Sequence, residues 1–156
     1  MNPRLRKSHN PHQSNKSHKA KSTSSASFSW FSQLQQLLKS VTVFNLPADR
    51  VVSEFFRKHA HLGARDRALF AETAFALLRR YEAYSLLSKT NPDLPPLFSL
   101  TALALADAAP ERFSSVLDEQ EHNTLQQMQA QMDLAPPHIQ CHLPQWLFDR
   151  LLNQYG

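Results

Sequence analysis

The stretch ARDRALFAETAFALLRRYEAYSLLS, residues 64–88, is the most informative part of this chain for its fold class. Its apolar residues recur every three or four positions, which is the spacing of one face of an α-helix. Arg65, Glu72 and Arg79 follow one another at intervals of seven, on the opposite side. The pattern predicts one long helix at the centre of the core, and its buried face comprises Leu69, Phe70, Thr73, Ala74, Leu77, Leu78, Tyr81 and Tyr84.

Two further helices are expected ahead of this stretch. One starts at Pro47, because proline has no N–H to lose in the first turn of a helix. It closes at Gly63, which we expect in the left-handed conformation that ends many helices. Apolar residues at helical spacing over residues 28–43 predict a first amphipathic helix.

Prolines divide the remainder of the chain. Residues 89–96 contain three of them and are expected to form a linker, followed by a helix over 97–109 that Pro110 ends. Residues 111–133 suggest two short peripheral helices, and Leu143-Pro144 opens a last one. No segment of six or more residues alternates with the period of a strand. The sequence therefore predicts an all-α helical bundle.

The charge of the chain is unevenly spread. Residues 1–27 carry six basic residues and no acid, whereas the whole chain of 156 residues has a formal charge of +4. This segment has one large aliphatic residue, Leu5, so we expect a disordered basic tail. Its lysines would attract nucleic-acid phosphates without sequence selectivity, or would only keep the chain in solution.

Composition excludes several classes of protein. With two glycines, Gly63 and Gly156, the chain cannot hold a dinucleotide-binding fingerprint or a P-loop. One cysteine allows no intrachain disulfide and no cysteine-cluster zinc site. There is no apolar run of the ~18 residues that span a bilayer, and no apolar core follows the basic N-terminus as in a secretory signal. We expect a cytoplasmic protein with no membrane partner.

Individual reactive residues give little sign of catalysis or of metal binding. Cys141 lies between His138 and His142, but adjacent side chains point in different directions, so a packed thiol in a linker is the favoured interpretation. His59 and His61 lie near a helix end, where capping of carbonyls is favoured over phosphate contact. We expect no catalytic residue and no metal site.

The basic residues of the body are the candidate functional residues. Lys39 to Arg80 contains eight bases and four acids, and Tyr81 to Gly156 contains three bases and nine acids. A basic surface on the second and third helices is typical of proteins that bind the nucleic-acid backbone. Pairing with acids and helix capping is the alternative, and Arg67 is the expected structural arginine. The candidate phosphate contacts are Arg50, Arg57, Lys58, Arg65, Arg79 and Arg80.

DNA is not an expected partner. A helix–Gly63–helix arrangement resembles a helix-turn-helix, whose second helix must expose side chains to the major groove. Here the second helix is long and apolar over a wide face, so sequence-specific DNA recognition is not expected.

Two segments of the chain also resemble a known family. Residues 47–84 contain Leu62-Gly63, Asp66-Arg67, Glu72 and Leu77-Leu78-Arg79-Arg80, and residues 143–147 read Leu-Pro-Gln-Trp-Leu. Together these segments resemble the N-terminal region of the Sun/RsmB family of S-adenosylmethionine (SAM)-dependent RNA cytosine-C5 methyltransferases. They cover about a third of the chain, and their order and spacing carry the match.

The resemblance implies a shortened, NusB-like helical RNA-binding domain over residues 28–142 with ribosomal RNA as its partner. Residues 143–156 would begin a linker helix toward a methyltransferase domain that this chain lacks. SAM is expected for a full-length family member and no cofactor for this segment, so the chain would be inactive alone. Two alternatives stay open: a helical module that packs on the catalytic domain without touching RNA, and a complete enzyme with unfamiliar chemistry.

Overall fold

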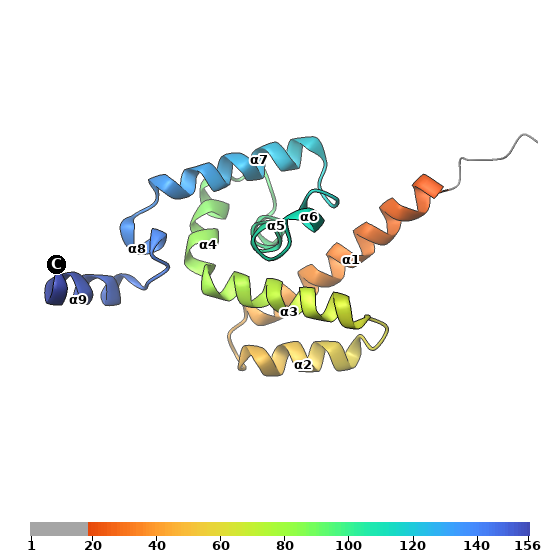
Figure 1. Ribbon diagram of the computed structural model, residues 1–156, viewed down its shortest axis with the longest axis horizontal. Coiled ribbons are helices and arrows are strands. Elements are labelled where there is room, and N and C mark those ends of the chain that lie inside the picture. Colours follow the sequence, from red (N-terminus) through yellow and green to blue (C-terminus); the bar gives the residue numbers. More distant parts are fainter. Residues whose placement is uncertain (1–18) are drawn as a thin grey trace, which may run out of the picture.

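A computed structural model describes the backbone of residues 19–156 and the side chains of residues 29–156. Within these residues the chain forms α-helices and one 3-10 helix, with no β-strand, so the predicted all-α class is confirmed (Figure 1). The elements in chain order are α1 (Lys19–Val41), α2 (Ala48–Lys58), α3 (Ala64–Arg79), α4 (Tyr81–Thr90), α5 (Pro96–Ala108), α6 (Pro110–Phe113), α7 (Glu119–Ala130), η1 (Gln131–Leu134), α8 (Pro137–Gln140) and α9 (Gln145–Tyr155).

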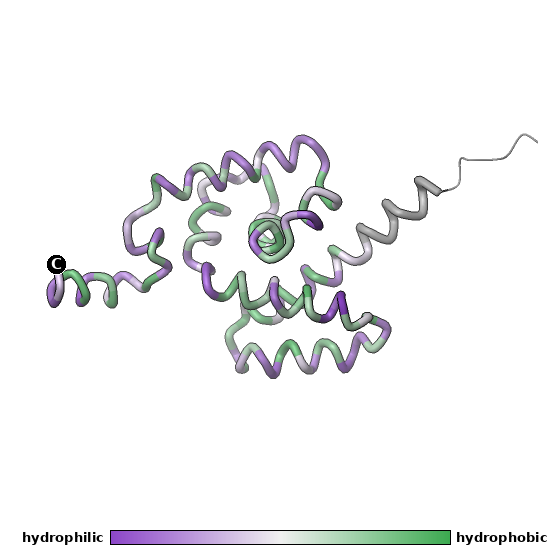
Figure 2. Tube along the Cα trace, in the orientation of Figure 1, coloured by the Kyte–Doolittle hydropathy of each residue, from purple (hydrophilic) through white to green (hydrophobic). Residues whose placement is uncertain are grey.

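The centre of the bundle is α5. It contacts α1, α3, α4, α6 and α7, which surround it when the molecule is viewed along its axis (Figure 1). All five residues from Thr101 to Leu105 are buried, and Figure 2 shows this helix as largely hydrophobic. A helix that is apolar on every side belongs inside the core, whereas an amphipathic helix covers it. The prediction that residues 64–88 form the centre was therefore wrong.

Residues 64–88 do not form one helix. The chain breaks at Arg80, with φ −121° and ψ 22°, and α4 leaves in a new direction. No proline or glycine marks this point in the sequence. A tertiary contact explains the break: the Arg80 guanidinium lies 2.6 Å from a carboxylate oxygen of Asp107, at the end of α5. The bend lets both α3 and α4 pack against α5.

Gly63 does not adopt the predicted left-handed conformation. It precedes α3 with φ −67° and ψ 164°, an extended conformation open to any residue. The turn between α2 and α3 is closed instead by Arg67, whose Nε donates to the carbonyl of Leu62 at 2.9 Å. A second guanidinium nitrogen donates to the carbonyl of Ala60 at 3.1 Å. This confirms Arg67 as a structural arginine.

The predicted helix starts are confirmed where proline precedes them. α2 starts one residue after Pro47, and α9 starts one residue after Pro144. The two short helices predicted within residues 111–133 correspond to α7 and, less closely, to α6, which begins at Pro110. α8 lies in a segment that we expected to be linker, and Cys141 after it is exposed rather than packed.

The first helix is longer than predicted. α1 begins at Lys19, although helix was expected only from residue 28. The segment from Lys19 to Ser27 contains no proline or glycine that would stop a helix. The rest of the predicted disordered tail, residues 1–18, lies outside the described residues.

None of the helices in residues 19–156 combines the length and the apolarity needed to cross a bilayer.

Candidate nucleic-acid interface

All six predicted phosphate contacts are exposed. Helix α2 carries three of them and α3 carries two, while Arg80 occupies the break between α3 and α4. The helices leave these side chains outside because the opposite faces of α2 and α3 pack inward through Val52, Phe55, Phe70 and Leu77. Exposure is required of a residue that binds the nucleic-acid backbone, so the six residues meet the first condition for the predicted role.

The structure places five of the six bases in two groups, and the sixth, Arg50, lies near the start of α2. Arg57 and Lys58 end α2 and Arg65 begins α3, so these three flank the α2–α3 turn. Arg79 and Arg80 lie at the other end of α3, about 21 Å along the helix axis from Arg65 at 1.5 Å per residue. The bases therefore do not form one continuous patch.

Two of the bases are held by acids. Arg50 pairs with Glu54 one turn along α2, with 3.4 Å between nitrogen and oxygen. Arg80 pairs with Asp107. Among residues 29–156 no carboxylate lies within ion-pair distance of Arg57, Lys58, Arg65 or Arg79. Pairing with acids therefore applies to Arg50 and Arg80 and not to the other four. Helix capping, the other half of the alternative, stays open for Arg57, Lys58 and Arg79, which lie in the last turn of their helices.

Charge follows the order of the helices. α2 and α3 belong to the segment with eight bases and four acids, and α4 to α9 belong to the segment with three bases and nine acids. The acidic first turn of α7 is used within the chain, because the side chain of Asp118 accepts from the backbone N–H of Glu121 at 2.8 Å. The excess of positive charge within residues 39–156 therefore lies on the side of α2 and α3.

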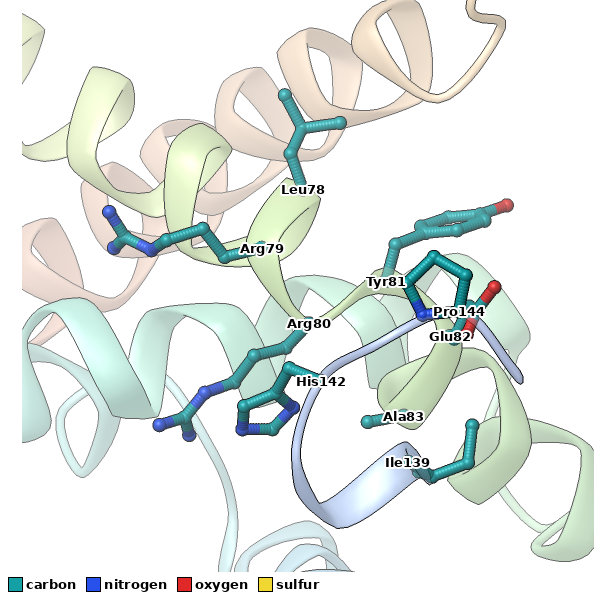
Figure 3. Close-up of a pocket in the computed structure, with 9 residues that line it drawn as sticks. All are labelled: Leu78, Arg79, Arg80, Tyr81, Glu82, Ala83, Ile139, His142 and Pro144. Carbon is teal, nitrogen blue, oxygen red and sulfur yellow. The ribbon is translucent and has the colours of Figure 1, made fainter. Parts of the chain in front are cut away.

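Two hollows adjoin the break between α3 and α4. The smaller, about 190 Å³, lies between the break and the α8–α9 segment and includes His142 and Pro144 in its lining. Figure 3 shows Arg79 leaving the chain on one side of the break and Arg80 on another, alongside His142. The larger, about 550 Å³, lies between the outer face of α3 and the end of α5, and its lining residues are Glu72, Phe75, Ala76, Arg79, Arg80, Asp107 and Ala108. Arg79 and Arg80 line both hollows.

A partly buried polar network holds Arg80. The hydroxyl of Tyr84 donates to the same Asp107 oxygen that receives the Arg80 guanidinium. Tyr84 is 3% exposed, and burial raises the pKa of its phenol above the ordinary value, with the Asp107 carboxylate adding to the effect and Arg80 opposing it. The phenol therefore stays protonated and holds the carboxylate in place.

Among the described residues, the histidines and the cysteine do not gather into one cluster. His59 binds the carbonyl of Phe55 through Nδ1 at 2.9 Å, as expected for a capping residue, while His61 lies 2.9 Å from the side-chain oxygen of Gln33. In the part of the chain that the structure describes, no three histidine, cysteine or carboxylate side chains gather as they would around a metal ion.

Two residues that line the larger hollow, Phe75 and Asp107, were not predicted from the sequence. Phe75 is 39% exposed on the outer face of α3, between Glu72 and Arg79. Its position three residues after Glu72 and four before Arg79 places it on the polar face of the helix, which was a usable signal. No local sequence pattern identifies Asp107, because its partners Arg80 and Tyr84 lie 27 and 23 residues away in the sequence.

Comparison with models of protein families, with curated proteins and with solved structures finds no match to this chain.

Proposed function

We propose that this chain is an RNA-binding domain that positions its substrate for a separate methyltransferase unit. The observation that carries the proposal is the exposure of Arg57, Lys58, Arg65 and Arg79 on α2 and α3 without an acid partner among residues 29–156. These unpaired cations lie in the basic half of the chain, and the other half is acidic. Such a distribution of charge favours an anionic partner. The resemblance to the Sun/RsmB family names RNA as that partner.

The bases act by electrostatic docking. Each arginine or lysine that contacts a phosphate releases condensed counterions, so affinity falls as salt rises. The separation of about 21 Å between the two groups of bases along α3 would let a bound strand follow the length of the helix. Such contacts set the position of the strand and carry no sequence information.

SAM does not fit this chain. A loop that binds it in a doubly wound domain needs glycines at the start of a helix for close approach of the backbone. Gly63 is the one glycine next to a helix start, and Arg67 ties the turn beside it to the carbonyls of Leu62 and Ala60. We assign no step of methyl transfer to these residues.

The test is an RNA titration at two salt concentrations with matched charge variants. The full chain, Arg65→Gln/Arg79→Gln and the control Lys89→Gln/Arg150→Gln are titrated with one labelled RNA. Both variants remove two positive charges, but the control removes them from the acidic half of the chain. We expect the first variant to weaken binding and to reduce the slope of log affinity against log salt by about two units, one for each contact. Equal slopes for the two variants would contradict the proposal.

A second candidate function rests on α9. This helix buries no residue and contacts α8, and it exposes Trp146, Leu151, Leu152 and Tyr155. An amphipathic helix with its apolar residues exposed is typical of an interface. On this view the chain packs on the methyltransferase domain that the resemblance implies and makes no RNA contact. The same titration distinguishes the two, because this function predicts no RNA affinity beyond that of the basic N-terminal segment.

A further inference from the structure

The geometry points to a binding site for one unpaired nucleotide in the larger hollow, between the outer face of α3 and the end of α5. Its base would lie against Phe75 and its phosphate on Arg79 and Arg80. The inference rests on the proposed function and goes beyond it, because backbone docking alone does not distinguish single-stranded from duplex RNA.

The shape of the site comes from α3. Glu72, Phe75, Ala76 and Arg79 are spaced by three, four and seven residues, so they share one face of the helix. Asp107 and Ala108, the last residues of α5, form the opposite wall. The hollow measures about 550 Å³, within the range of ~300–1,000 Å³ typical of small-molecule sites. Ala76, a small residue, also lines the hollow.

The charges of the lining favour a nucleotide over a simple anion. Two carboxylates, Glu72 and Asp107, balance two guanidinium groups, Arg79 and Arg80. A free phosphate ion would meet both signs of charge. A nucleotide brings a phosphate for the arginines and, from its base, N–H groups that carboxylates accept. Phe75 supplies the aromatic face on which unpaired bases stack.

Arg80 is oriented before any ligand arrives. One guanidinium nitrogen, Nη1, contacts Asp107, whose carboxylate also accepts a hydrogen bond from the hydroxyl of buried Tyr84. A guanidinium has five N–H donors in a planar fork, so this pairing leaves Nε and the other terminal nitrogen for a phosphate. Asp107 and Tyr84 are therefore positioning residues, and the arginine enters binding with less loss of side-chain freedom.

The test compares single-stranded and duplex RNA of the same length. The full chain, Phe75→Leu, Phe75→Trp and the control Tyr155→Leu are titrated with both RNAs at one salt concentration. Tyr155 is an exposed aromatic residue on α9, so the control removes a ring from a different helix. Phe75→Leu keeps an apolar side chain at a position that the core does not use.

We expect Phe75→Leu to weaken single-stranded binding about tenfold, as loss of one base–aromatic stack does, and to leave duplex binding within about twofold. Phe75→Trp should retain the affinity and should show quenched fluorescence of the new indole when single-stranded RNA binds. Tyr155→Leu should match the unchanged chain.

Failure of this inference differs from failure of the proposed function. If the chain binds RNA with the expected salt dependence but Phe75→Leu loses nothing, the nucleotide site is refuted and backbone docking stands. If the unchanged chain binds neither RNA, both are refuted. A Phe75→Leu variant whose thermal unfolding differs from that of the unchanged chain is replaced by Phe75→Trp, for which absence of quenching is the contradicting result.

Discussion

Replacement of Arg67 tests how the turn between α2 and α3 is held. Its guanidinium donates to two backbone carbonyls, those of Leu62 at 2.9 Å and Ala60 at 3.1 Å, and lies 6.0 Å from the ring centre of Phe56. A glutamine cannot reach both carbonyls. Arg67→Gln therefore removes the charged donor from the carbonyl of buried Leu62.

The magnitude follows from the two hydrogen bonds. A hydrogen bond to a charged group contributes ~1.5–3 kcal/mol when it is buried. Leu62 is buried and Ala60 is exposed. The bond to the Leu62 carbonyl should therefore contribute a free energy near that range, and the bond to the Ala60 carbonyl should contribute much less. We expect a loss of about 2–3 kcal/mol of unfolding free energy. At a urea dependence of ~2 kcal/mol per molar, the unfolding midpoint should fall by about 1 M.

The assay is urea unfolding followed by the helical signal in far-ultraviolet circular dichroism. Arg65→Gln is the matched control, because Arg65 lies two residues away in the same helix and is exposed. A surface change of this kind shifts stability by less than ~0.5 kcal/mol. A midpoint for Arg67→Gln equal to that for Arg65→Gln would refute the role of Arg67 in closing the turn.

Three further outcomes are expected. Folding raises the pKa of the Tyr84 phenol above the unfolded value of ~10. The stability that this phenol contributes is therefore fully present below pH ~10 and falls as the pH rises above it. Tyr84→Phe should lessen this fall in unfolding experiments between pH 9 and about 11. Gly63→Ser should raise the unfolding midpoint slightly, since the extended conformation at the start of α3 suits a serine cap, which is worth about 0.3 kcal/mol relative to glycine, and a lowered midpoint would show that the position needs glycine. Leu103→Ala in α5 should cost ~2–5 kcal/mol by chemical unfolding, whereas Leu134→Ala, at 86% exposure, should cost under ~0.5 kcal/mol.

Local signals in the sequence were sufficient for most of the helices. Pro47 and Pro144 each lie one residue before a helix start because proline fits the beginning of a helix and disfavours helix in the residue before it. The helix predicted over residues 97–109 is present as Pro96–Ala108. Periodicity also identified most of the buried face of α3.

Long-range contacts limited the prediction elsewhere. The break at Arg80 depends on Asp107, which lies 27 residues further along the chain, so no local pattern could reveal it. The central position of α5, by contrast, had a local signal, because a helix that is apolar on every side belongs inside the core. Exposure of the six bases was predictable from helical spacing. Which of them are held by acids was not, because pairing depends on where the helices meet.

Mapping bound RNA onto individual arginines separates docking on α2 and α3 from binding anywhere else on the chain. Nuclear magnetic resonance of the isotope-labelled chain resolves both the backbone amides and the arginine Nε–H groups during titration with single-stranded RNA. We predict that resonances of Arg57, Arg65, Arg79 and Arg80 shift with the added RNA while those of α9 do not. Shifts confined to α9 or to the first 27 residues, with these four arginines unchanged, would show that the basic helices do not bind RNA.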